Sequence, residues 1–322
     1  MSTRRYLLVK ILQTMLTLAF VLVFNFFLFR ALGSPIDNLL HGRAPLTPEA
    51  FTNLKRQLGL DLPLPQQFVH YVGQTLQGHL GYAFDGTPVS QEIGARVWPT
   101  LLLVGTSTIA SIVIGVWIGI AQGWRRGSKF DQAALGSTLV LYSMPEFWFG
   151  LLMIMLFSVT FHIFPVGGMQ TPASGYEGAH HVVDVLNHLA LPFFVLTVSY
   201  LAEYSLIMRS SLMETLGEDY ITTARSKGML EKQVLNRHAV PNALLPTMTV
   251  TILSLGFVIS GAITIELIFS WPGLGNLTVT AIHERDFATL EGLFLVFSGA
   301  IIVANLVADL LYSHFDPRVR AS

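Results

Sequence analysis

The sequence predicts an all-α protein that crosses a membrane six times and carries a small helical lobe outside the membrane. Three observations predict this class. Only 12% of the 322 residues are charged, against about a quarter in a soluble domain. A further 52% are apolar, and the mean hydropathy is +0.56. Apolar stretches of about twenty residues, which cross a bilayer as a helix, alternate with shorter polar segments.

Charge and motif content exclude several other functions. The formal net charge of −1 argues against a nucleic-acid partner. The chain has no cysteine, which excludes disulfides, thiolate catalysis and cysteine-based metal sites. The sequence holds no Walker motif for ATP binding, no HExxH and no GxSxG. We therefore expect no enzyme activity in this chain.

The first region, residues 1–30, is predicted to be a membrane span. Its apolar core over residues 6–29 is too long for a cleaved signal peptide, and no small-residue cleavage site follows it. Asn25 inside this span is expected to make a buried contact between helices.

The second region, residues 31–97, is predicted to be an external lobe of about three short helices. Thr47-Pro48 and Thr87-Pro88 are typical helix starts, with a capping residue before a proline. Residues 65–78 give the third candidate helix.

The third region, residues 98–322, is predicted to hold the other five spans. The second span covers residues 98–121, and its small side chains should let another helix approach closely. Residues 130–164 are interrupted at Pro145, and we interpret them as one kinked span, because two spans would violate the distribution of positive charge. The small side chains of the second span are Gly105, Ser111, Gly115 and Gly119.

Residues 165–187 contain no lysine or arginine, as expected of a short external loop. His181, Asp184 and His188 could share a helix face and bind a metal, but no fourth ligand is evident. An interfacial helix on the bilayer surface is the favoured interpretation. We assign no metal site.

Two acidic residues in the next spans are candidates for the translocation path, because ionisable groups within spans usually have a function. Glu203 lies in the fourth span, residues 188–208, where it could face a cavity, pair with Arg209 or extend toward the membrane surface. Glu266 lies in the fifth span, residues 245–268.

The last span, residues 292–311, carries Asn305 and Asp309, which are expected to face other helices. Before it, Pro272, Gly273 and Gly275 predict a tight turn just outside the membrane, which could shape an outer gate.

A long polar interruption separates the fourth and fifth spans. We predict a helix over residues 218–227, with acids at its start, bases at its end and Gly228 as its stop. Tyr220, Ile221 and Ala224 should form one narrow apolar face. A second helix over residues 230–239 should end at Pro241, with Leu230, Val234 and Leu235 along one stripe.

This interruption resembles the cytoplasmic coupling loop of ABC-importer permeases, most closely the oligopeptide/dipeptide subfamily. Thr222 and Thr223 depart from that loop's general pattern, which has Glu and Ala there. Further matches are Leu58-Gly59-Leu60-Asp61, Met144-Pro145, His188-Leu189, Glu266-Leu267-Ile268-Phe269 and Asp316-Pro317-Arg318. The resemblance implies that the ATPase docks on Asp219, Tyr220, Thr223, Ala224, Arg225, Lys227, Gly228, Arg237 and His238, within a loop over residues 210–244.

The resemblance implies a type I ABC-importer permease that moves di- or oligopeptides by alternating access; related permeases also carry nickel or peptide conjugates. It implies a second homologous permease subunit, two ATPase subunits that bind ATP and Mg²⁺, and an external solute-binding protein. A secondary transporter or channel without an ATPase is the alternative, which paired broken helices and several mid-membrane charges would favour.

The distribution of positive charge predicts the orientation. Thirteen of the nineteen lysines and arginines fall on the side of the termini and the coupling loop, and six fall on the other side. Both termini and the loop are therefore expected in the cytoplasm of a bacterial cell, with the chain in its plasma (inner) membrane.

Overall fold

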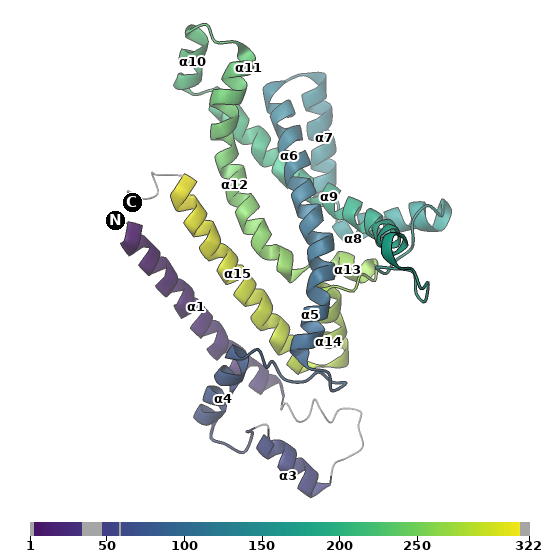
Figure 1. The fold of residues 1–322 in the computed structure, drawn as a ribbon. Helices are drawn as coiled ribbons and strands as arrows, with labels where there is room; N and C mark the ends of the chain where they lie inside the picture. The colour runs from purple at the N-terminus through teal and green to yellow at the C-terminus, as the bar shows by residue number, and fades with distance from the viewer. Residues whose placement is uncertain (1–2, 34–46, 58, 316–322) are drawn as a thin grey trace. The chain divides into compact units, whose positions relative to one another are not determined.

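The computed structural model describes residues 3–33, 47–57 and 59–315, and all regular elements in these ranges are helices (Figure 1). The all-α prediction is confirmed. Packing divides the chain into two units. The terminal unit comprises residues 1–100, 259–263 and 272–322, and the central unit comprises residues 101–258 and 264–271. These units are defined by packing within the chain, not by the membrane. They therefore do not test the predicted division into regions 1–30, 31–97 and 98–322, which stays a prediction.

Five helical stretches in the described residues are long and apolar enough to cross a membrane, and a bent helix pair makes a sixth if it counts as one span. This agrees with the six predicted spans. The five stretches are Leu8–Leu32, Val89–Trp124, Gly178–Leu216, Glu231–Ile268 and Phe287–Leu310.

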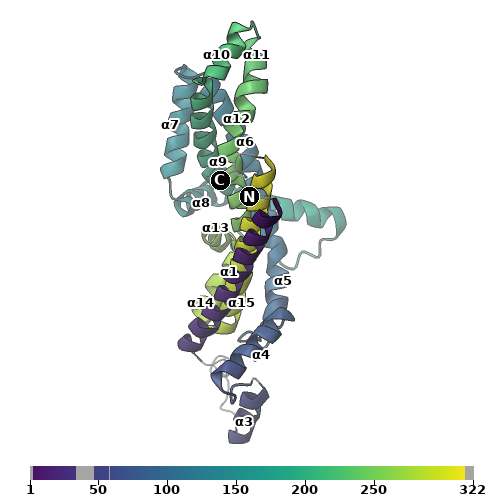
Figure 2. The ribbon, with the colours of Figure 1, turned by 90° about the vertical axis from the view of Figure 1, so that its left-hand side faces the viewer.

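In the terminal unit, the long helices α1 (Thr3–Leu32) and α15 (Phe287–Phe315) run side by side (Figures 1 and 2). The buried Asn25 donates a hydrogen bond to the Tyr71 hydroxyl at 2.8 Å, as the predicted interhelical contact requires. The remaining helices of this unit are α3 (Pro48–Gln57), α4 (Leu64–Leu76), α5 (Val89–Thr100) and α14 (Leu274–Glu284).

The three predicted lobe helices exist as α3, α4 and α5, but α5 is also the start of the second span. It continues through a π-helical turn, Leu101–Gly105, into α6 (Thr106–Trp124). The predicted start at Trp98 was therefore wrong by more than two turns. Pro99 lies inside the helix without ending it, because neighbouring groups in a membrane helix can satisfy the carbonyl that proline leaves free.

The central unit is built on the packing of α6 against α9 (Gly178–Leu216). A Cβ atom on Gly115 would lie 2.6 Å from the Leu201 carbonyl oxygen, and one on Gly119 would lie 2.6 Å from that of Ser205. Only glycine permits this approach, so the predicted role of the small residues is confirmed.

The bend predicted near Pro145 is present but far sharper than a kink. Helix α7 (Lys129–Ser143) meets α8 (Glu146–Met153) and its π-helical extension Ile154–Thr160 at 99°. Met144 adopts an extended conformation, φ −81° and ψ 125°, which the following proline favours.

Helix α9 extends beyond the predicted fourth span, residues 188–208, at both ends, and Pro192 lies within it without ending it. The fifth span consists of α12 (Val240–Phe257), a 3-10 turn (Val258–Ser260) and, after a short break, α13 (Ile263–Ile268).

Two of the polar contacts considered above do not form. Arg209 does not pair with Glu203; its Nε lies 2.7 Å from Asp131 Oδ1 on α7, and Glu203 is exposed. Asp309 faces a helix as expected and pairs with Lys10 at 2.8 Å, whereas Asn305 is exposed. Residues 316–318, which resemble the C-terminal tail of ABC-importer permeases, lie outside the described residues.

Candidate functional site

The polar interruption folds into two short helices at one end of the central unit (Figure 1). Helix α10 spans Asp219–Ser226, which confirms the first predicted helix to within a residue at each end. Helix α11 spans Glu231–Val234 and continues as a π-helical stretch, Leu235–Ala239.

The inner face of α10 is buried in the chain's own core. Ile221 is fully buried, and Ala224 is 5% exposed. They pack with Met208 and Leu212 of α9, Val234 of α11 and Ala243 of α12, and with partly buried side chains of α6. One hydrophobic cluster therefore joins α10 and α11, the predicted docking helices, to the ends of three spans. Its buried members are Met208, Leu212, Ile221, Ala224, Val234, Ala239 and Ala243.

The outer face of α10 is polar and exposed. Tyr220 is 42% exposed whereas Ile221 and Ala224 are buried, so the prediction that the three share one narrow apolar face was wrong. Conversely, Ala224 cannot fill a cleft on another protein while it lies in this core. Burial, followed by the charge of Glu218, raises the pKa of Tyr220, so its phenol stays neutral at physiological pH. The exposed predicted docking residues are Asp219, Tyr220, Thr223, Arg225, Lys227, Gly228 and Arg237.

Gly228 ends α10 as predicted, with φ +76°. Its N–H donates to the Arg225 carbonyl at 2.9 Å, and the Met229 N–H donates to the Ala224 carbonyl at 3.4 Å. This pair of bonds is the Schellman motif, in which glycine takes the left-handed position. The motif fixes the turn that leads from α10 into α11.

An ion pair closes the turn on its outer side. Arg225 donates from Nε to Glu231 Oε1 at 3.1 Å and from Nη2 to Oε2 at 3.3 Å. Sequence reasoning assigned Arg225 to the partner surface and missed Glu231. The signal was available, because Glu231 opens α11 directly after the glycine turn.

Pro241 does not end the second helix, contrary to prediction. It occupies the first turn of α12, where its missing N–H costs little, and the π-helical turn before it accommodates the proline ring. Of the predicted stripe, Val234 is buried, Leu235 packs on the cluster and Leu230 is 69% exposed. His238 is half-buried here, and its carbonyl accepts a hydrogen bond from the Asn242 side chain at 2.7 Å.

The tight turn predicted at Pro272, Gly273 and Gly275 lies earlier, at Phe269–Ser270, where Ser270 has φ +49°. Gly273 is extended, and Gly275 already lies inside α14. Gly273 precedes the first residue of α14, and the Leu274 N–H donates to the Thr100 hydroxyl at 2.7 Å. Gly273 and Gly275 are buried. The predicted role of Pro272, Gly273 and Gly275 in an outer gate stays a prediction.

The two acidic candidates for the path differ in environment. Glu203 is exposed on α9, and Glu266 is fully buried on α13. Tyr200 of α9 lies within electrostatic range of both Glu266 and Glu146, a third acidic residue at the start of α8. Their role in transport stays a prediction.

No cluster of metal ligands occurs among the described residues. Asp184 instead accepts hydrogen bonds from the backbone N–H and the hydroxyl of Thr171, both at 2.7 Å. The imidazole Nδ1 of His188 lies 2.8 Å from the Asp184 carbonyl oxygen. The two bonds from Thr171 fasten the loop before α9 to that helix.

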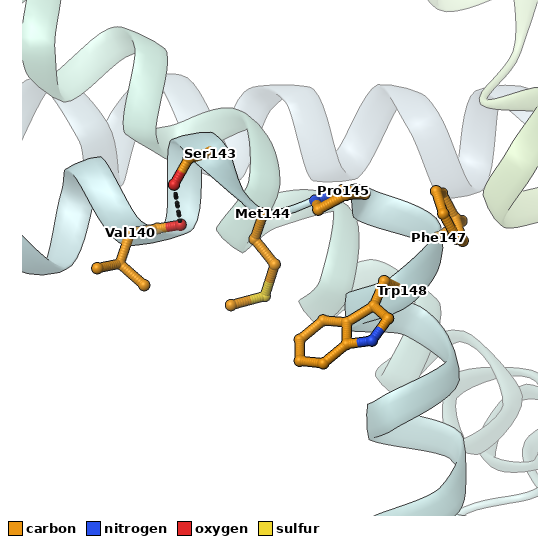
Figure 3. A pocket seen from close by; sticks show the side chains of 6 residues that line it. All are labelled: Val140, Ser143, Met144, Pro145, Phe147 and Trp148. Atoms are coloured by element: carbon orange, nitrogen blue, oxygen red, sulfur yellow. Dashed lines mark hydrogen bonds between the residues drawn. The ribbon is translucent and has the colours of Figure 1, made fainter.

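The bend between α7 and α8 forms an apolar concave surface of about 420 Å³ (Figure 3). No charged side chain lines it, and the exposed Trp148 and the half-buried Met144 lie along it. It therefore suits lipid or another apolar helix rather than a charged solute.

Comparison with known proteins identifies the family. Residues 111–321 match the family described as "Binding-protein-dependent transport system inner membrane component", and residues 3–91 match the N-terminal region of such membrane components. A putative peptide permease protein of Brucella suis is 39% identical over 90% of this chain and 90% of its own length.

Two further relatives are similar over most of their length. The dipeptide transport system permease protein DppB of Escherichia coli is 37% identical over 95% of this chain and 94% of its own. The oligopeptide transport system permease protein AppB of Bacillus subtilis is 38% identical over 81% and 82%. The chain therefore belongs to the inner membrane components of binding-protein-dependent transport systems, as a multi-pass permease that works with a binding protein and a separate ATPase.

Proposed function

We propose that this chain is one permease subunit of an ATP-driven peptide importer. It works beside a second homologous permease, two ATPase subunits that bind ATP and Mg²⁺, and an external solute-binding protein. The substrate class rests on the peptide, dipeptide and oligopeptide permeases to which the chain is similar over most of its length.

The observation that carries the mechanism is the two-sided character of α10. Its inner face lies in a cluster with the ends of α6, α9 and α12, and its outer face exposes polar side chains. An ATPase that holds the outer face transmits force to three spans at once. The docking helices act as a lever only if their docked geometry differs in free energy between the inward-open and outward-open states.

This mechanism requires the docking helices and both termini to lie in the cytoplasm, where ATP is available. The excess of lysine and arginine on that side of the membrane supports this orientation.

The test is ATP-dependent uptake of a radiolabelled dipeptide by the four-subunit assembly in proteoliposomes with its binding protein. A Gly228→Trp variant should remain in the membrane but lose uptake, because a side chain is strained at φ +76° and the bulky ring obstructs docking. Gly136→Trp is the matched control, since a Cβ there meets nothing within 4 Å. Normal uptake by the Gly228 variant would refute the lever.

A secondary transporter or channel is the second candidate. Its support is Glu266, an acidic residue that is fully buried within the spans of the central unit. Uptake by the permease pair without the ATPase subunits would favour it.

A further inference from the structure

The terminal unit contains a cavity of about 680 Å³ that the transport mechanism does not use. Its volume falls within the usual range for small-molecule sites, about 300–1,000 Å³. The end of α1, one side of α4, the loop before α5 and the start of α15 form its walls.

A cation and an anion line this cavity without forming an ion pair. Arg30 of α1 and Glu291 of α15 are both lining residues, and neither has an ion-pair partner among the described residues. Both side chains are half-buried, and charges of opposite sign that are partly removed from water normally pair with each other or with a ligand. Arg30 and Glu291 lie within electrostatic range of each other but make no ion-pair contact, so a molecule that carries both charges can bridge them.

Neighbouring side chains hold the two charged groups in place. Arg30 donates to Gln67 Oε1 at 2.6 Å and lies 5.3 Å from the ring centroid of Phe26. The Tyr71 hydroxyl accepts from Asn25 at 2.8 Å and is hydrogen-bonded to Glu291. Burial, then the charge of Glu291, raises the pKa of Tyr71 above its usual range, so the phenol remains a donor.

The polar network is also incomplete. Arg30 Nε and Asn25 Oδ1 are buried and lack a hydrogen-bond partner. Unsatisfied buried polar atoms are uncommon in folded proteins and call for an explanation. One donor and one acceptor without partners beside this cavity are consistent with an absent ligand that has both kinds of group.

The charged residues of the cavity lie near the ends of two candidate spans. Arg30 is two residues from the end of the candidate span Leu8–Leu32, and Glu291 is four residues after the start of Phe287–Leu310. One helical turn deeper, Phe26 and Leu295 provide an apolar wall. This combination fits a lipid better than a water-soluble zwitterion such as a dipeptide.

We propose that this cavity binds the headgroup of a zwitterionic phospholipid, with its phosphate at Arg30 and its primary ammonium at Glu291. The bound lipid fastens α4 to α1 and α15. The site is independent of substrate transport, and its occupancy can be measured without any uptake assay.

The test is native mass spectrometry of the purified permease assembly, exchanged into detergent with equal amounts of phosphatidylethanolamine, phosphatidylcholine and phosphatidylglycerol. We expect one retained phosphatidylethanolamine. Arg30→Gln and Glu291→Gln should each reduce its retention about tenfold, the effect of losing one charge-assisted contact. Lys55→Gln and Glu49→Gln on α3, both exposed and away from the cavity, are matched controls and should change nothing.

A second measurement needs no substitution. The wild-type protein should prefer phosphatidylethanolamine to phosphatidylcholine about tenfold, because a trimethylated ammonium offers Glu291 no N–H donor. Equal retention of these two lipids, preferential retention of phosphatidylglycerol, or displacement of the lipid by dialanine would overturn the proposal. Unchanged retention in both charge variants would overturn it as well.

Discussion

Shortening Ile221 to alanine should disconnect the docking helix from the spans while its partner surface stays intact. Ile221 is fully buried in the cluster formed with α9, α11 and α12. The change removes three carbon groups, worth about 2–5 kcal/mol when the cavity left behind is included. The other local contacts of α10 are weaker. The Ala224 methyl contributes about 0.8 kcal/mol, and the exposed Arg225–Glu231 pair contributes at most about 1 kcal/mol.

Because the Ile221 side chain makes the strongest of these contacts, its loss should leave α10 free to move without the spans. In proteoliposomes, Ile221→Ala should retain ATP hydrolysis and lose most dipeptide uptake, and the isolated permease should unfold at a lower temperature. Tyr220→Ala, one residue away on the exposed face, is the matched control; it should leave the unfolding temperature unchanged and weaken ATPase binding. If Ile221→Ala kept full uptake per ATP hydrolysed, the buried cluster would not transmit force.

Three further predictions test other parts of the structure. Gly119→Val should push α6 away from α9, because a Cβ there lies 2.6 Å from a backbone oxygen, and should lower the yield of folded protein. The control Gly136→Val should leave the yield unchanged, and equal yields of the two variants would contradict the close packing. Asp131→Asn should weaken the contact that joins α7 to Arg209 and lower the free energy of unfolding by about 1–3 kcal/mol. Glu214 is exposed, so Glu214→Gln should leave the free energy of unfolding unchanged in the same denaturation assay. Gly228→Ala should lower the free energy of unfolding by about 1–2 kcal/mol through backbone strain alone, since a Cβ there meets no atom within 4 Å. A larger loss of stability in thermal unfolding would show that the turn is tightly packed instead.

The spans could be predicted because a run of some twenty apolar residues has few other stable conformations in a membrane protein. The close approach of α6 and α9 followed from glycines spaced four residues apart, a local pattern. The ends of the spans could not be predicted in the same way. Pro241 was expected to end a helix, yet it lies in the first turn of α12. Pro99 and Pro192 lie inside helices, where surrounding groups compensate for the missing donor.

Side-chain partners in the candidate site were harder to predict than its helices. Asp131 lies 78 residues from Arg209, and no local pattern connects them. On α10, the helical period places Ile221 and Ala224 on one face, but it cannot say whether that face meets this chain or another protein. Packing against α9 and α12 decided the question: Ile221 and Ala224 are buried in this chain, and Tyr220 stays exposed.

Photocrosslinking from the exposed face of α10 tests the central claim most directly. A benzophenone amino acid replaces Tyr220 in the assembled importer, and in a second variant it replaces Trp117, which is 70% exposed on α6 within a span. We predict an adduct with the ATPase subunit from position 220 and none from position 117. If position 220 gave no adduct with the ATPase in an assembly that imports dipeptide, the docking helices would not be the point where ATP hydrolysis acts on this chain.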